Sequence, residues 1–165
     1  MDTQLAPSTS LLQIHQLLEV HTRLYHNVNE GMDNHLLERP NEMTNHVAWL
    51  AGHLVSARYL MLNALGLDVQ EPYPGLFAQG KGLEQGADYP DLQTLRKCWS
   101  EVSGILLKAV ADAGDESLSG KAPFATPTGE TVGEFLNFFV HHEAYHLGQL
   151  GILRRIFRED ALKYN

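Results

Sequence analysis

One stretch near the C-terminus, residues 135–153, constrains the fold of this chain more than any other part of the sequence. It reads FLNFFVHHEAYHLGQLGIL, contains no proline and is long enough for about five helical turns. At about 100° per residue, its apolar side chains gather on one face together with two imidazoles. This face carries Phe135, Phe138, His142, His146, Gln149 and Leu153, with Phe139 and Leu150 beside it. The pattern predicts an amphipathic helix whose core stripe contains His142 and His146.

The two histidines of this stripe are candidate metal ligands. His142 and His146 are four residues apart, so their rings lie one above the other on a helix. This spacing lets both rings reach one metal ion at about 2.0–2.1 Å. The alternative is a pair of core histidines that form hydrogen bonds with other side chains. Because two protein ligands rarely make a metal site, metal binding requires a third ligand from another part of the chain.

Three further segments have helical periodicity. The first begins at a cap, Ser8 or Ser10, and runs to about residue 29. The second runs from about residue 42 to residue 65, before a glycine that suits a helix C-terminus. The third begins near residue 90 and runs to about residue 113. A T-x-x-E capping box at Thr131 and Glu134 begins the C-terminal helix.

Two long links separate the predicted helices. Residues 66–88 and 114–130 are rich in glycine, proline and small polar residues, and neither shows sustained alternation, so we expect loops. The first link exceeds the usual length of a helix–helix connection, which indicates a crossover or a functional loop. Four long helices joined in this way predict an all-α fold, a four-helix bundle in one domain over residues 1–165.

The second predicted helix offers the third ligand. His46 and His53 both lie on its inner face, seven residues and about 10 Å apart along the axis. One ion cannot be reached equally well from both positions, and helical geometry alone leaves the choice between them open. His21 lies on the inner face of the first helix, whereas His141 lies about 100° away from the histidine face of the last helix.

Composition and charge exclude several classes of function. The 165 residues include nine histidines and one cysteine, Cys98, and carry a net charge of −8. This charge argues against a nucleic-acid-binding surface. No apolar run approaches the roughly 20 residues of a membrane span, and the N-terminal segment lacks the basic start and apolar stretch of a signal peptide. A lone cysteine excludes an internal disulfide. We therefore expect a cytoplasmic protein that binds neither nucleic acid nor membranes.

The segment HEAYH also matches H-E-x-x-H, the motif of zinc proteases in which the glutamate is the general base. No G-x-x-H follows the motif, and no strand pattern precedes it that would form a substrate-binding edge. We therefore reject the protease interpretation. We expect Glu143 instead to accept a hydrogen bond from a histidine ring.

The opposite face of the C-terminal helix is apolar or small, although a surface helix would carry polar residues there. It contains Val140, Ala144, Leu147, Gly148 and Gly151. One interpretation is packing against the chain's own termini, and the other is close approach of a second copy. We expect a homodimer that uses the surface formed by Ala144, Gly148 and Gly151.

Two segments contain ordered motifs that go beyond helical periodicity. NHVAWLAGHLVSARYLMLNALG (45–66) fits the pattern N-x-φ-x-W-x-x-x-H-φ, where φ is apolar, at Asn45, Val47, Trp49, His53 and Leu54. TVGEFLNFFVHHEAYHLGQLGILRR (131–155) fits H-E-x-Y-H-φ-G-Q at His142, Glu143, Tyr145, His146, Leu147, Gly148 and Gln149. In these motifs, and in their order and separation, the sequence resembles the DinB/YfiT-like superfamily of metalloenzymes.

The resemblance implies a four-helix bundle that binds a divalent metal through His53, His142 and His146, and so selects His53 over His46. The superfamily includes transferases and isomerases that use low-molecular-weight thiols, which implies a small-molecule substrate. Three imidazoles leave at least one open position on the metal, as catalytic zinc sites do. Imidazole suits several ions, so zinc or nickel is expected first, with iron and manganese as alternatives.

Two functional classes stay open. The first is a divalent-metal-dependent enzyme, either a transferase acting on a small thiol and a small electrophile or a hydrolase. It calls for a substrate-sized cavity beside the metal, lined from residues 66–88 and 114–130. The second is a non-catalytic metal-binding protein of stress response, with a sealed site. Gln149 has two possible roles: it orients a ligand or substrate, or it is a core amide whose hydrogen bonds are satisfied. Tyr145 either packs against its neighbours or donates a hydrogen bond.

Overall fold

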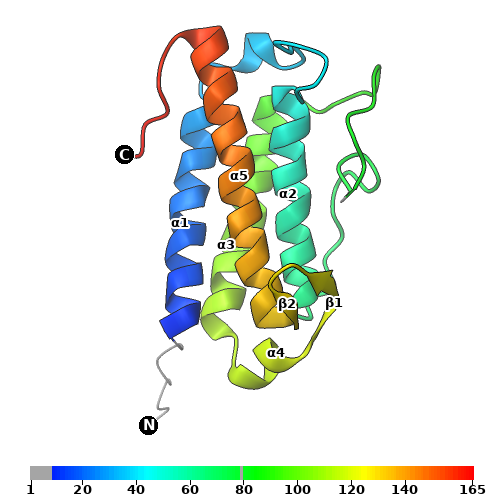
Figure 1. Cartoon of the computed structure of the whole chain (residues 1–165), viewed down its shortest axis with the longest axis vertical. Helices are drawn as coiled ribbons and strands as arrows, with labels where there is room; N and C mark the ends of the chain where they lie inside the picture. The colour runs from blue at the N-terminus through cyan, green and yellow to red at the C-terminus, as the bar shows by residue number, and fades with distance from the viewer. Residues whose placement is uncertain (1–8, 79) are drawn as a thin grey trace.

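Four long helices form the body of the protein in a computed structural model that describes residues 9–78 and 80–165. They are α1 (Thr9–Asn29), α2 (Val47–Ala64), α3 (Leu92–Asp112) and α5 (Val132–Arg158), and a short 3-10 helix, η1 (Asp33–His35), lies between α1 and α2. In Figure 1, α1 and α5 run in one direction and α2 and α3 run in the other. The all-α fold class and the four-helix bundle predicted from the sequence are confirmed.

The arrangement of the helices explains the long first link. α1 and α2 lie diagonally across the bundle, and each packs against both α3 and α5. Because the neighbouring helices α2 and α3 are parallel, the chain must cross the length of the bundle between them, and residues 66–88 make this crossover (Figure 1). The crossover also covers the outer side of α2, where the buried ring of Phe77 lies against Gly52. α2 is therefore buried on nearly every side, and its side chains are apolar with few exceptions.

The helix ends follow capping chemistry and correct one predicted boundary. Helix α2 begins at Val47 and not near residue 42, because the Nδ1 atom of His46 accepts the backbone N–H of Trp49 and makes His46 the N-cap. Asp91 caps α3 by accepting the N–H of Thr94 at 2.7 Å. The capping box of Thr131 with Glu134 is present at the start of α5. Of the expected caps for α1, Ser10 lies inside the helix and Ser8 lies outside the described residues.

The segment 114–130 corrects a second prediction, since it is not a plain loop. It contains the short helix α4 (Asp115–Ser119) and the strand β1 (Lys121–Thr126), which pairs antiparallel with β2 (Gly129–Thr131). Gly129, the first residue of β2 after the turn, has a φ of 143°, which only glycine adopts readily. The hairpin packs on the first turns of α5, where the rings of Phe124 and Phe135 lie 5.1 Å apart.

The outer face of α5 divides into two parts. Val140 and Leu147, the larger residues of this face, are buried in the protein's own core and are not available to a second copy. Ala144 and Gly148 are exposed, and no heavy atom of the described residues would lie within 4 Å of a Cβ placed on Gly148 or Gly151. Homodimer formation through these three small residues stays a prediction. Across residues 9–78 and 80–165, no helix combines the length and the hydropathy that crossing a membrane requires.

Candidate metal centre

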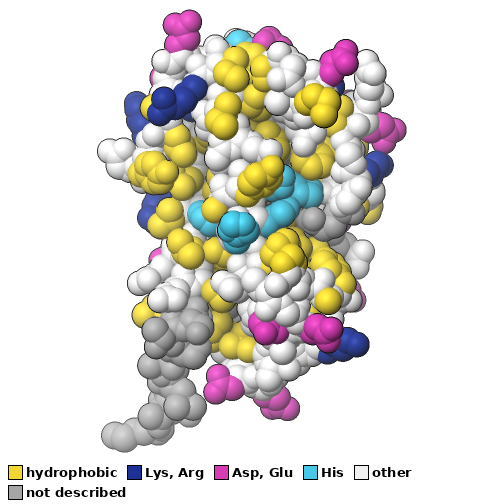
Figure 2. Space-filling model, in the orientation of Figure 1, with side chains coloured by type: hydrophobic (Ala, Val, Ile, Leu, Met, Phe, Trp, Pro, Cys, Tyr) yellow, Lys and Arg dark blue, Asp and Glu magenta, His cyan; other side chains and the backbone are white. Residues whose placement is uncertain are grey.

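Three histidine rings from two neighbouring helices meet halfway along the bundle. His53 lies near the middle of α2, and His142 and His146 lie on successive turns of α5. The Nε2 atom of His142 is 3.0 Å from Nε2 of His53 and 3.1 Å from Nε2 of His146. No other histidine, cysteine, aspartate or glutamate of the described residues joins this group, called the triad below. In Figure 2, histidine side chains gather at the middle of the face formed by α5 and α2.

Hydrogen bonds to the outer ring nitrogens determine which atoms of the triad carry lone pairs. The Nδ1 atom of His53 lies 2.9 Å from the carbonyl oxygen of Phe77, which can only accept, so Nδ1 is the donor. The Nδ1 atom of His146 likewise donates to Oε1 of Gln149 at 2.7 Å. Both Nε2 atoms are therefore unprotonated, and they face the third Nε2 atom, which has at most one proton to share between them. A cation would satisfy all three nitrogens at once.

The separations within the triad agree with metal coordination. With metal–nitrogen bonds of about 2.0–2.1 Å, two ligands lie about 2.9 Å apart at a right angle and about 3.3 Å apart at the tetrahedral angle. The observed 3.0 and 3.1 Å fall within this interval. The donor set, three imidazole nitrogens, is one that zinc, nickel and iron accept. The triad is compatible with a divalent metal ion.

Burial keeps the triad in the form that binds metals. Removal from water is the main cause that lowers the pKa of His53 to about 4, and together with the two neighbouring imidazoles it lowers the pKa of His142 to about 3. The pKa of His146 is also lowered by burial, although its hydrogen bond to Gln149 opposes this. At neutral pH the three rings are therefore uncharged, and no proton has to leave before a metal ion can bind.

Two aromatic side chains and a series of hydrogen bonds support the histidine rings of the triad. The ring of Trp49 stacks on His53 at 4.5 Å with an interplanar angle of 14°, and Phe139 lies 5.3 Å from the ring of His142. Gln149 both holds His146 and donates through Nε2 to the hydroxyl of Tyr145 at 3.3 Å. Tyr145 is 60% exposed, so this series of hydrogen bonds connects the triad to the surface. Tyr145 accepts a hydrogen bond here, and Gln149 orients a triad ring.

The remaining candidate histidines have other partners. His46 is the N-cap of α2, and its ring lies 4.7 Å from that of Tyr89. His141 is exposed on α5. His21 lies in the core and contacts Glu143 through Nδ1 at 3.0 Å. The structure brings His53, and not His46, together with His142 and His146, and the assignment of these three as metal ligands stays a prediction.

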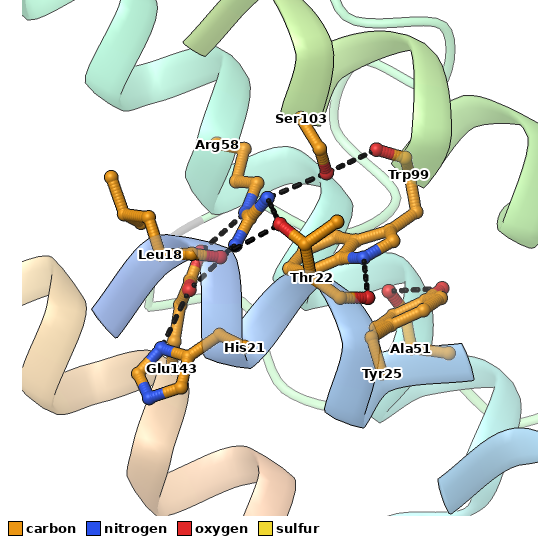
Figure 3. A network of polar contacts seen from close by, with 9 residues as sticks. All are labelled: Leu18, His21, Thr22, Tyr25, Ala51, Arg58, Trp99, Ser103 and Glu143. Atoms are coloured by element: carbon orange, nitrogen blue, oxygen red, sulfur yellow. Dashed lines mark hydrogen bonds and ion pairs between the residues drawn. The ribbon is translucent and has the colours of Figure 1, made fainter. Parts of the chain in front are cut away.

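Glu143 is at the centre of a buried polar network that excludes the protease role (Figure 3). Its carboxylate is 0% exposed and accepts two hydrogen bonds from Arg58, at 2.7 and 3.0 Å. Although burial raises the pKa of Glu143, the charge of Arg58 and the contact with His21 hold it below its usual value. Glu143 does accept from a histidine ring, as expected, but the ring belongs to His21, outside the triad. A carboxylate occupied in this way cannot serve as a general base.

Two functional features of this arrangement, the carbonyl of Phe77 and the side chain of Arg58, belong to no sequence motif. The carbonyl of Phe77 orients His53, but a backbone oxygen in a link leaves no signal in the sequence. Arg58 had a weak signal, because it is the one charged residue of α2, a helix that is otherwise almost entirely apolar. Its remaining donors bind Thr22, Ser103 and the carbonyl of Leu18, and its guanidinium lies 3.7 Å from the ring of Trp99.

A cavity of about 340 Å³ lies between α2, the crossover and β1 and is called the Glu71 pocket below. It is lined from α2, from the 66–88 crossover and from β1, by residues that include Ser56, Tyr59, Asn63, Glu71, Ala78 and Phe124. Ser56 lies one helical turn after His53, and Ala78 follows the residue whose carbonyl holds that histidine. Its volume is in the range of small-molecule sites. The pocket is lined from both links, but no triad residue lines it, so a substrate cavity beside the metal stays a prediction.

Together, the fold and the site define a helical bundle with a buried three-histidine group compatible with a divalent metal. The profile of the DinB superfamily matches residues 16–150, and the chain belongs to this superfamily. The matched range contains the triad and the Glu71 pocket. A search of curated proteins finds no match.

Proposed function

We propose that this protein is a divalent-metal-dependent enzyme that transfers a low-molecular-weight thiol to a small electrophile, with His53, His142 and His146 as the metal ligands. The observation that carries the proposal is the convergence of three uncharged imidazoles: Nε2 of His142 lies 3.0 Å from that of His53 and 3.1 Å from that of His146, and the three ligand atoms all lie within 4.8 Å of one another. Three protein ligands leave a position for an exchangeable ligand, whereas a structural zinc site is closed by four. Zinc or nickel suits these ligands first, with iron and manganese as alternatives.

The residues around the triad have separate tasks in this proposal. When bound, a divalent ion would favour the thiolate form of a thiol substrate, which is its nucleophilic form. Phe77 and Gln149 fix the two outer rings so that each presents Nε2 inward. Trp49 and Phe139 pack against the rings and limit the access of water. Phe77 and Gln149 are positioning residues, since they act through His53 and His146.

The Glu71 pocket favours an enzyme over a non-catalytic metal-binding protein. A storage or structural site needs no space beside the metal, whereas a transferase must hold an organic substrate next to it. The pocket is lined by Ser56, which lies one helical turn after His53, and has the size of a small-molecule site, about 340 Å³. We place the organic part of the thiol substrate in this pocket.

A thiol panel tests the proposal directly. Metal-loaded protein is incubated with individual cellular thiols and a chloronitrobenzene, so that the sulfur bonds to the ring carbon, chloride leaves and the thiol proton passes to solvent. With at least one thiol, the metal-loaded protein should form product faster than the chelator-treated protein does. The His142→Ala variant should lose this activity, and the matched His141→Ala variant should keep it. If metal-loaded protein shows no turnover with any thiol or electrophile, the non-catalytic alternative replaces the proposal.

A further inference from the structure

The charge of the Glu71 pocket is unbalanced. Glu71 is half-buried and, among the described residues, is the only charged one that lines the cavity. Its Oε2 atom accepts a hydrogen bond from the hydroxyl of Ser56 at 2.5 Å, and no ion pair within the described part of the chain includes Glu71. A carboxylate that is partly removed from water attracts a counter-ion more strongly than a fully exposed one. The pocket therefore favours a cationic group over a neutral or anionic one.

The other lining groups indicate what kind of cation fits. Tyr59 and Phe124 bring two aromatic rings to the cavity, and the side chain of Asn63 adds an amide. The Nδ2 and Oδ1 atoms of this amide already bond to the backbone of Val69, so the amide stabilises the wall and offers little to a ligand. Aromatic faces attract an organic ammonium group and also pack against an apolar body. A hydrated metal ion would make no use of these rings.

We propose that the Glu71 pocket binds the protonated amine of the substrate, with Glu71 as its counter-ion, and that the substrate is an aminothiol. The assignment to the thiol partner rests on the proposed function, because the sulfur is then held at the triad. Three relations connect the pocket with the triad: Ser56 lies one turn from His53 on α2, Ala78 follows Phe77, whose carbonyl holds His53, and Phe124 lies 6.4 Å from Phe139 between ring centres. The proposal requires that the substrate extend from the pocket to the triad.

Binding of amines without a thiol tests the pocket independently of the metal. Metal-free, isotopically labelled full-length protein is titrated with primary amines from butylamine to 2-phenylethylamine, each compared with its matched alcohol, and NMR shifts give the dissociation constants. At least one amine should bind tenfold or more tightly than its alcohol, with shifts at Gln70 and Ala78. The cavity of about 510 Å³ that is lined by Ile105, Lys108 and Asp112 serves as the internal control; because Asp112 is already paired with Lys108, this cavity should show no saturable shifts.

Three variants separate charge from structure. Glu71→Gln should abolish the tenfold preference for the amine. Ser56→Ala removes the hydrogen bond but keeps the charge, so it should retain the preference within about threefold. Glu84→Gln, in the same crossover but paired with Lys81 at the surface, should behave like the wild type. Equal binding of amine and alcohol by the wild type, or an unchanged preference in Glu71→Gln, overturns the proposal.

A second measurement tests the assignment to the thiol. With metal-loaded protein, aminoalkanethiols of increasing length should have a KM at least tenfold below that of the matched hydroxyalkanethiols, and Glu71→Gln should remove this difference while kcat changes little. Equal KM values for the two series overturn the aminothiol assignment. If amine binding depends on Glu71 but no thiol reacts, the thiol chemistry of the proposed function has failed and the amine pocket stands. If thiols react but no amine binds, the pocket proposal has failed alone.

Discussion

The substitution Gly52→Ala tests whether the crossover positions the triad. A Cβ atom at Gly52 would lie 2.1 Å from Cζ and 2.3 Å from Cε1 of Phe77, whereas ordinary contacts begin at 3.4 Å. The ring must therefore move by about 1.3 Å, the difference between 3.4 and 2.1 Å. Because this ring is only 1% exposed, it cannot turn outward freely, and we expect the backbone of the crossover to move with it. That backbone carries the carbonyl oxygen that holds His53 at 2.9 Å.

Two opposing energies set the expected size of the effect. Overpacking a core position costs about 1–3 kcal/mol, and the aromatic ring places this case near the upper end. Alanine gains about 1 kcal/mol over glycine in a helix. The net loss of stability is about 2 kcal/mol, which lowers Tm by about 4–8 °C in a protein of this size. Loss of the bond from Phe77 to His53 should weaken metal binding by about 10- to 100-fold, as for other partners of metal-ligating histidines.

Thermal unfolding and zinc titration against a competing chelator measure both effects. Gly104→Ala is the matched control, since it lies inside α3 with nothing in the described residues within 4 Å of its Cβ position, and it should raise stability by up to about 1 kcal/mol. In a Phe77→Ala background, Gly52→Ala should also become stabilising because the ring is gone. A rise in Tm for Gly52→Ala itself, with unchanged zinc affinity, would refute this account.

Four further outcomes follow from the same structure. Alanine at any triad histidine should sharply reduce zinc content by elemental analysis after equal loading, whereas His141→Ala should retain it. As pH falls from about 6.5 to about 4, the histidines of the unfolded chain take up protons before the buried ones do. The free energy of unfolding of the metal-free protein should therefore fall by up to about 1.4 kcal/mol per pH unit for each histidine. Chemical denaturation measures this slope, which should be absent above about pH 7. Arg58→Met should cost about 3–5 kcal/mol because it removes the guanidinium partner of the buried Glu143 carboxylate, and restoring stability with Glu143→Leu in the same chain would support this cause. Light scattering should give about twice the chain mass, and Gly148→Arg should abolish the dimer; a monomeric wild type would exclude this interface.

The sequence was informative wherever periodicity determines position. The apolar stripes of α1, α3 and α5 and the spacing of His142 and His146 follow from 3.6 residues per turn. The third ligand required tertiary information, because His46 and His53 share a helical face in any periodic scheme. Nothing in that scheme shows that His46 is the N-cap of α2. Because of this cap, the helix begins at Val47 and not near residue 42.

The small sheet and the crossover contact were beyond sequence reasoning for a different reason. The strands β1 and β2 are short and stabilise each other through pairing and through contact with α5, so neither has a pattern of its own. The approach of Phe77 to Gly52 joins two segments that no periodicity connects. A glycine at position 52 indicates only that space is needed there, and not which residue fills it.

The ion pair between Arg58 and Glu143 also acts as a register lock for the two helices that bear the triad. Sliding α5 along α2 by one turn would displace the two charges by about 5.4 Å and leave both unpaired in a dry core, at a cost of several kcal/mol. The same slide would carry His142 away from His53. Misaligned bundles that lack the three-histidine group are thus also the ones that bury isolated charges. The core network selects the assembled site during folding, before any metal ion is present.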